Sequence, residues 1–233
     1  MTVLILNVLC EGQTEELFVK DVLKPYLKSL GLIVKHRLLV TSRKKNASGG
    51  MLSYQQAKND LLLWMKEVSG NKGERHYFTT MFDLYALPND FPGWAEAAKQ
   101  KDKYAMVREI EHAFAEDMQS LLFIPYIQLH EFEALVFCGL EHLLSDYPGC
   151  QKEIEGLEEV LRSYHNNPEE IDNSPASAPS KRIAKALAKK YKYNKPKSGA
   201  MVTNSVGIEV LRQKCRHFDE WLLKLERING FVQ

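Results

Sequence analysis

Short apolar runs alternate with segments of helical periodicity through the first 138 residues, and this alternation constrains the fold more than any other feature of the sequence. The run from Val3 to Leu9 has the apolar character of a central parallel strand covered on both faces. The alternation predicts an α/β fold with a central, mostly parallel four-stranded sheet flanked by helices. Strands are expected at residues 3–9, 32–41, 77–84 and 121–129, and helices at about 14–30, 52–68 and 104–118.

The pattern changes after Cys138, where helical periodicity dominates. Helices are expected at residues 154–164, 183–190 and 206–227, the last with a break near Arg216. Residues 165–180 are rich in Pro, Asn and Ser and are interpreted as a loop or linker. We therefore expect an α/β core at residues 1–138 and a mainly helical elaboration at residues 139–233 that packs on it.

Charge and cysteine content narrow the class of protein. The net charge is +1, so attraction to nucleic acid or membrane has to be local. The four cysteines form no C-x-x-C pair, and the apolar opening is too short and lacks the basic leader of a signal or membrane segment. These features predict a cytoplasmic protein with free thiols and no membrane contact.

Carboxylates follow three of the four predicted strands. Glu11 follows the first, Asp83 the third, and Glu131 and Glu133 the fourth. Ligands of parallel sheets bind beyond the carboxyl ends of the strands. Hard cations such as Mg²⁺ or Mn²⁺ take oxygen ligands, often one or two carboxylates completed by water and phosphate. Glu131 and Glu133 share a side only if the strand continues; in a regular helix they point apart.

Simpler explanations exist for several acidic residues. Glu15 and Glu16 are explained by the dipole of the helix that they begin, and Asp83 also suits a turn. Zinc, Walker A, dinucleotide-binding and nucleophile-elbow motifs are missing from the sequence. Zinc chemistry, ATP hydrolysis, dinucleotide redox chemistry and serine hydrolysis are therefore disfavoured.

A basic segment runs from Lys181 to Lys197 without an acidic residue, with Tyr191 and Tyr193 among its lysines. Basic residues with aromatic neighbours suit contact with a nucleic-acid backbone and base stacking. Cations at a helix start are unfavourable unless an anion binds there. Phosphate binding is therefore expected at Ser180, Lys181, Arg182 and Lys185. The alternatives are a solvated lysine-rich face, or a weaker phosphate site at Arg43, Lys44 and Lys45.

Four blocks, VLCEGQTEELF, FDLYALPNDFPG, HEFEALVF and SAPSKR, together resemble the bacterial family of domain-of-unknown-function 4276 proteins. The resemblance covers most of the chain. It implies a relative of the Toprim fold of topoisomerases, primases and overcoming-lysogenization-defect-type nucleases. It also implies an ATPase partner and a role in phage defence.

The resemblance assigns roles by position. Glu11 corresponds to the Toprim glutamate after the first strand, an acid/base group or metal ligand, and Asp83 to the first aspartate of the D-x-D motif. Tyr85 stands where the second aspartate belongs, which weakens the case for two-metal chemistry. Glu131 or Glu133 is a candidate for the missing carboxylate, and Asp90 is a lower-ranked one.

These observations lead to the hypothesis of a metal-dependent nuclease that hydrolyses phosphodiester bonds of DNA or RNA. Glu11, Asp83, Glu131 and Glu133 are its expected catalytic and metal-binding residues, with Mg²⁺ or Mn²⁺ as cofactor. The alternative is a non-catalytic sensor or adaptor subunit of an ATPase complex with a degenerate Toprim core. Phosphotransfer to a small nucleotide is a weaker third option, and a homodimer stays open.

Overall fold

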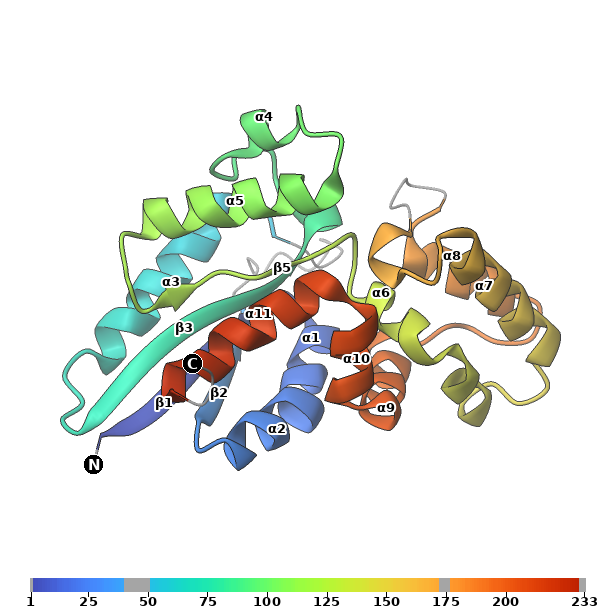
Figure 1. Ribbon diagram of the computed structural model, residues 1–233, viewed down its shortest axis with the longest axis horizontal. Coiled ribbons are helices and arrows are strands. Elements are labelled where there is room, and N and C mark those ends of the chain that lie inside the picture. Colours follow the sequence, from blue (N-terminus) through green and yellow to red (C-terminus); the bar gives the residue numbers. More distant parts are fainter. Residues whose placement is uncertain (1, 40–50, 172–176, 231–233) are drawn as a thin grey trace.

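The computed structural model describes residues 2–39, 51–171 and 177–230. Its centre is a five-stranded parallel sheet of order β2-β1-β3-β4, in which β5 also pairs with β3 (Figure 1). The predicted mostly parallel sheet flanked by helices is confirmed. The strands are β1 (Val3–Cys10), β2 (Ile33–Leu38), β3 (Glu74–Asp83), β4 (Phe123–Ile124) and β5 (Ile127–Gln128).

Helices cover both faces of the sheet, so the molecule has three layers (Figure 1). One face carries α3 and α5, whose apolar side chains join one core cluster. The other face carries α1, η1, α2 and α11, which contribute to a second cluster. Their bounds are α1 (Gln13–Phe18), η1 (Val19–Leu23), α2 (Lys24–Ser29), α3 (Tyr54–Val68), α5 (Lys103–Met118) and α11 (Arg216–Glu226).

Strand β1 is buried on both faces, as its apolar sequence requires. Leu6 and Val8 belong to the cluster under α1 and α11, whereas Leu9 belongs to the cluster under α3 and α5. This alternation follows the two-residue period of a strand. Asn7 is the polar exception, and its side-chain amide donates to the Tyr77 carbonyl at 3.0 Å.

The helix predicted at residues 14–30 forms as three consecutive pieces. The middle piece, η1, is π-helical, and the Lys24 N–H donates to the Val19 carbonyl. Pro25 explains the irregularity, because it lacks an N–H and its ring crowds the preceding turn. The helix ends as predicted at Gly31, whose φ is +79°.

The strand predicted at residues 121–129 is interrupted, so the described part of the chain has five strands instead of the predicted four. Pro125 separates β4 from β5 because it has no N–H to donate to the ladder. Thr80 of β3 bridges the gap: its hydroxyl donates to the Tyr126 carbonyl at 2.9 Å and accepts from the Tyr126 N–H at 3.0 Å. Both short strands thus stay attached to β3.

The later helices are partly as expected. The helix predicted at residues 206–227 forms as α10 and α11, separated by Cys215, and α9 precedes them without having been predicted. The remaining elements are η2 (Leu84–Ala86), α4 (Trp94–Ala97), α6 (Glu133–Val136), η3 (Phe137–Ser145), α7 (Gln151–Ser163), η4 (Pro168–Glu170), α8 (Pro179–Leu187), α9 (Lys195–Val206), α10 (Ile208–Lys214) and η5 (Arg227–Asn229).

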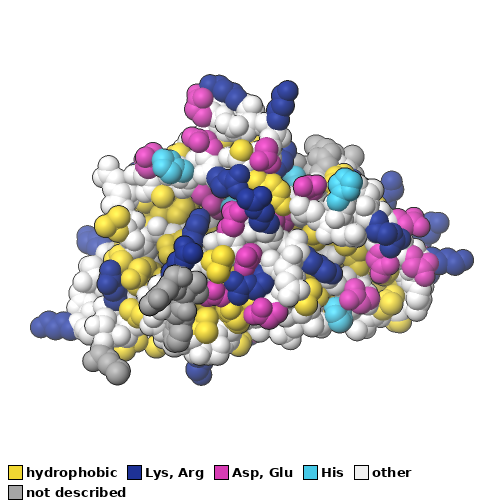
Figure 2. Space-filling model, viewed as in Figure 1, with side chains coloured by type: hydrophobic (Ala, Val, Ile, Leu, Met, Phe, Trp, Pro, Cys, Tyr) yellow, Lys and Arg dark blue, Asp and Glu magenta, His cyan; other side chains and the backbone are white. Residues whose placement is uncertain are grey.

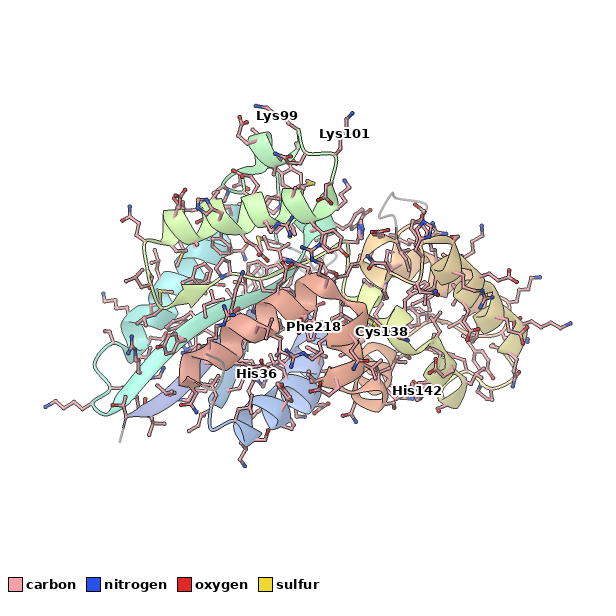
Figure 3. All side chains as sticks on the ribbon, in the orientation of Figure 1. His36, Lys99, Lys101, Cys138, His142 and Phe218 are labelled. Carbon is pink, nitrogen blue, oxygen red and sulfur yellow. The ribbon has the colours of Figure 1, made fainter. Side chains whose placement is uncertain are left out.

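Helix α11 packs across the sheet near the chain's C-terminal end. Phe218, labelled on α11 in Figure 3, packs edge-to-face on Phe18 of α1, with ring centroids 6.0 Å apart. Trp221 stacks on Tyr126 at 4.1 Å and donates its indole N–H to Thr79 of β3 at 2.9 Å. The core under this face therefore joins the first strands of the chain to its last helix.

The described residues of the segment interpreted as a loop or linker, 165–180, form turns up to residue 178, among them η4, and α8 begins at Pro179. Glu169 is fully buried and accepts from the His217 and Phe218 N–H groups at 2.9 and 3.1 Å, so it caps α11. The Tyr104 hydroxyl of α5 donates to the same carboxylate at 3.1 Å. The turn at η4 is therefore held between two helices of the core, α5 and α11.

Among the helices that the structure describes, none is long and apolar enough to cross a membrane.

Candidate functional site

The strand order places a crevice between the carboxyl ends of β1 and β3. The chain leaves β1 toward β2 on one side and leaves β3 toward β4 on the other, with connecting helices on opposite faces. Such a switch point is where open parallel sheets bind ligands. A pocket of about 450 Å³ lies there, lined by Glu11, Gly12, Gln13, Thr14, Glu15, Leu38, Leu39, Asp83, Lys195 and Pro196.

Glu11 and Asp83, predicted from neighbouring strand ends, lie side by side in this pocket. The Asp83 N–H donates to Oε2 of Glu11 at 3.0 Å. The Phe132 N–H donates to Oδ1 of Asp83 at 2.9 Å. Each carboxylate is thus oriented by a backbone N–H from a different segment.

Glu131 and Glu133 lie behind Lys195 at the edge of the pocket, where the chain turns out of the sheet and enters α6. His130 has a left-handed φ of +61°, and α6 begins at Glu133. The side chains converge on one ammonium: Nζ of Lys195 is 3.0 Å from Oε2 of Glu133 and 3.8 Å from Oε2 of Glu131. The two side chains therefore share a side, as a continued strand would place them, although the chain here turns at His130 and enters α6.

Lys195 is a site residue that the sequence did not single out. It begins α9, where Asn194 caps the helix by accepting from the Lys197 N–H. Burial alone would lower the pKa of Lys195, but attraction by Glu133, Asp83 and Glu131 outweighs burial and raises it. The ammonium therefore stays charged. Its sequence neighbours gave no sign of this role, because its partners lie far away along the chain.

Glu15 is a second residue whose position the sequence undervalued. It lies in the first turn of α1, as the helix-dipole explanation requires, and accepts from the Gly12 N–H at 2.8 Å. It is also buried and lines the pocket with Glu11 and Asp83. Its carboxylate therefore belongs to the electrostatics of the site as well as to the helix start.

Desolvation and mutual repulsion raise the pKa values of these acids. The pKa of Glu11 is raised to about 7, mainly by burial and further by Glu15, against the lowering effect of the Asp83 N–H. Burial likewise raises the pKa of Glu133 to about 7 despite its contact with Lys195. Burial, Glu15 and Glu11 raise the pKa of Asp83 well above its ordinary value. A cation at this site would relieve the repulsion.

The donor set suits a hard divalent cation. All the acids offer oxygen ligands, and among the described residues the Glu133 carboxylate has no hydrogen-bond partner besides the Lys195 ammonium, which lies 3.0 Å from its Oε2. In the described part of the chain, no three His, Cys, Asp or Glu side chains are arranged to hold an ion by themselves. Mg²⁺ usually takes only one or two protein carboxylates, and substrate phosphate and water complete its shell. The residues fit an ion of that kind rather than an all-protein cage.

The residues expected to bind phosphate surround the start of α8 and do not line the pocket. The Ser180 N–H donates to Oε2 of Glu131 at 3.1 Å, so the anion at this helix start is a carboxylate of the chain itself. Lys181 and Lys185 are exposed. Arg182 turns back and donates from Nε to the Ser177 carbonyl at 2.6 Å.

The other sequence candidates lie elsewhere. Asp90 accepts from the Tyr54 N–H at 3.0 Å, at the start of α3, and is not part of the pocket lining. Tyr191 and Tyr193 both pack beside Tyr147, with ring centroids 5.5 and 6.3 Å away. Residues 43–45 lie outside the described residues.

Charge on the face that carries α11 is mixed in sign. Figure 2 shows basic and acidic side chains interspersed across this face. Arg216 and Glu220 of α11 form an ion pair at 2.9 Å, and Arg212 of α10 pairs with Asp219 of α11 at 2.7 Å. On this face, opposite charges are thus paired with near neighbours.

Fold and site together define a parallel α/β protein with a carboxylate cluster at its switch point. The chain belongs to the family described as domain of unknown function (DUF4276), whose model matches residues 10–226. This range includes every residue of the carboxylate cluster and Lys195. No curated protein and no solved structure matches the chain.

Proposed function

We propose that the protein is a Toprim-like nuclease that hydrolyses phosphodiester bonds of DNA or RNA with Mg²⁺ or Mn²⁺. The observation that carries the proposal is the excess of negative charge at the switch point. Among the described residues, five carboxylates meet one ammonium there; fully ionised, they would sum to about −4. Such an excess is costly without a cation. Its residues are Glu11, Glu15, Asp83, Glu131 and Glu133, with Lys195.

Glu11 and Asp83 are the residues proposed to hold the ion, because they line the pocket and are already oriented by backbone N–H groups. The ion would neutralise charge on the scissile phosphate and lower the pKa of an attacking water. The pKa of Glu11, about 7, also suits a group that accepts a proton near neutral pH.

The remaining residues are proposed to act on the nucleic acid itself. Lys195 lines the pocket and offers an ammonium to a phosphate oxygen. Lys181 and Lys185 are exposed on α8, whose first turn contacts Glu131, and extend the contact along the backbone. The resemblance to the family adds an ATPase partner and a role in phage defence to the proposal.

A second candidate is a non-catalytic adaptor of an ATPase complex. Two observations favour it. Tyr85 replaces the second aspartate of the D-x-D motif and is 44% exposed. Lys195 already neutralises part of the Glu131 and Glu133 charge. If this candidate is correct, the carboxylate cluster no longer binds a metal, and Lys195 is the cation that neutralises it.

Cleavage of labelled single-stranded DNA, duplex DNA and RNA with Mn²⁺, Mg²⁺ or a chelator tests the proposal. Wild-type protein is expected to cut at least one substrate only with metal. Glu11→Gln and Asp83→Asn keep the size of each side chain and are expected to lose about 100-fold or more of the rate. Glu141→Gln, at a side chain that is 65% exposed, is the matched control and should cut like wild type.

Undiminished metal-dependent cleavage by both Glu11→Gln and Asp83→Asn would contradict the proposal. If wild-type protein cuts none of the substrates but co-purifies with an ATPase, the adaptor candidate replaces it.

A further inference from the structure

We infer that the site binds one divalent cation and that Lys195 occupies the position of a second. The inference rests on the proposed metal-dependent function and adds the number of ions and the identity of the second positive charge. It starts from the division of the cluster into two halves, one open to the pocket and one closed behind Lys195.

The outer half consists of Glu11, Glu15 and Asp83, all of which line the pocket. The inner half consists of Glu131 and Glu133, which are 3% and 0% exposed and are not among the lining residues. The Lys195 side chain is 43% exposed; it lines the pocket on one side and contacts both inner carboxylates on the other. It therefore separates the inner pair from the pocket.

Glu133 shows why a cation is needed at the inner position. Its carboxylate is fully buried, and within the described residues it has no hydrogen-bond partner other than the Lys195 ammonium. Buried charges are normally paired, because an isolated carboxylate is strongly destabilised away from water. Nζ of Lys195, at 3.0 Å, supplies the pairing. The ammonium thus stands where a metal ion would otherwise neutralise Glu131 and Glu133.

Lys195 is held in this place by the structure around it. It begins α9, where the helix dipole disfavours a cation, so its position depends on the carboxylates. The preceding residue is anchored: the Asn194 N–H donates to the Tyr147 hydroxyl at 2.9 Å, and its side chain caps the helix. A tethered ammonium costs less ordering entropy than a free ion that has to be bound.

For the substrate, this arrangement means that a phosphate group would lie between a divalent metal ion and the ammonium of Lys195. An ion at Glu11 and Asp83 and the ammonium of Lys195 both border the pocket. An ammonium is a compact point charge that contacts a phosphate oxygen but supplies no activated water. Lys195 would then stabilise negative charge on the phosphate. The single ion would lower the pKa of the attacking water, and Glu11 would accept its proton.

Counting bound Mn²⁺ by equilibrium dialysis tests the inference. Wild-type protein should bind one ion per chain. Lys195→Met, which removes the charge and frees the inner pair, should bind two, and Lys195→Met with Glu133→Gln should return to one. Lys197→Met is the matched control; Lys197 is two residues away, 68% exposed and paired with Asp146, so this variant should bind one. Circular dichroism melts verify that each variant is folded.

Two ions in wild type, or one ion in Lys195→Met, would overturn the inference and leave the proposed function standing. Binding of no ion by wild type would overturn the proposed function, and the inference with it.

A second measurement on the wild type covers the case in which Lys195→Met does not fold. The acetylation rate of Lys195, followed by mass spectrometry, should change less than twofold when Mn²⁺ is added, because the ion occupies the outer half. A tenfold rise would show that the metal displaces Lys195 and would overturn the inference.

Discussion

Asp83 lies at the carboxyl end of β3, and burial together with the charges of Glu15 and Glu11 raises its pKa. An acid whose pKa is higher in the folded than in the unfolded protein destabilises the fold at neutral pH. Its Oδ1 nevertheless has a fixed partner in the Phe132 N–H. The residue is therefore well positioned but electrostatically strained, as binding sites often are.

Asp83→Asn is predicted to stabilise the metal-free protein by about 1 kcal/mol near pH 8. Asn keeps an oxygen for the Phe132 N–H and removes the repelled charge. The gain should shrink as the pH falls and disappear below about pH 3, because the wild-type carboxylate is then protonated in both the folded and the unfolded state. Urea unfolding at a series of pH values measures it. A gain that stays constant with pH, or a loss at pH 8, would contradict this account.

The sequence predicted those site residues that lie at the carboxyl ends of strands. Glu11 and Asp83 end neighbouring parallel strands, and such ends share one edge of the sheet. Glu131 and Glu133 were named, but the sequence did not decide whether a strand or a helix continues through them; the chain turns at His130 and enters α6 at Glu133. Lys195 was missed because its contacts are entirely tertiary and it lies within a basic segment.

Among the elements, α9 determines where Lys195 lies. It begins after Asn194, whose side chain accepts from the Lys197 N–H, and Pro196 occupies its first turn. These are ordinary start signals of a helix. The basic composition of the segment drew attention to phosphate binding and away from its helical start.

Asn194→Ala is predicted to destabilise the protein by about 1 kcal/mol, because the first turn of α9 loses its cap. Asn194→Ser retains a capping oxygen and should cost only a few tenths of that amount. Denaturant unfolding of the two variants measures the difference. Equal stabilities would mean that the cap contributes nothing and that tertiary contacts alone fix the helix start.

The other elements missed from the sequence have clear physical causes. Pro125 divides the strand predicted at 121–129, because a residue without an N–H breaks the ladder. The turn at η4 has the composition of an exposed loop, yet Glu169 is buried as the cap of α11. In the first case one proline interrupts a strand that was otherwise predicted correctly. In the second case one buried carboxylate ties a loop to the core.

At the scale of the whole molecule, the sheet and its two helical layers were predictable from the alternation of periodicities, whereas the position of the last helix was not. One core cluster joins Leu6 and Val8 of β1 to Trp221 and Leu225 of α11. Nothing in the local sequence of α11 specifies which face of the sheet it covers, because that choice depends on packing against distant residues.

A chain that ends at residue 138 is predicted not to unfold cooperatively, because it exposes the sheet face that α11 covers. Trp221→Ala in the full chain tests the same contact more gently. It should cost about 3–5 kcal/mol, as deletion of a large buried aromatic side chain does. Thermal and denaturant melts measure both. A sharp unfolding transition in the shortened chain would show that residues 1–138 form an independent core.

Calorimetric titration of wild-type protein and Asp83→Asn with Mn²⁺ at pH 8 tests the central claim, that the carboxylate cluster is a cation site, most directly. Wild type should bind saturably, and Asp83→Asn should bind at least about 10-fold more weakly. Binding should weaken at pH 6, because Glu11 and Glu133, with pKa values of about 7, then hold protons. Saturable binding of equal strength in the two proteins would contradict the claim.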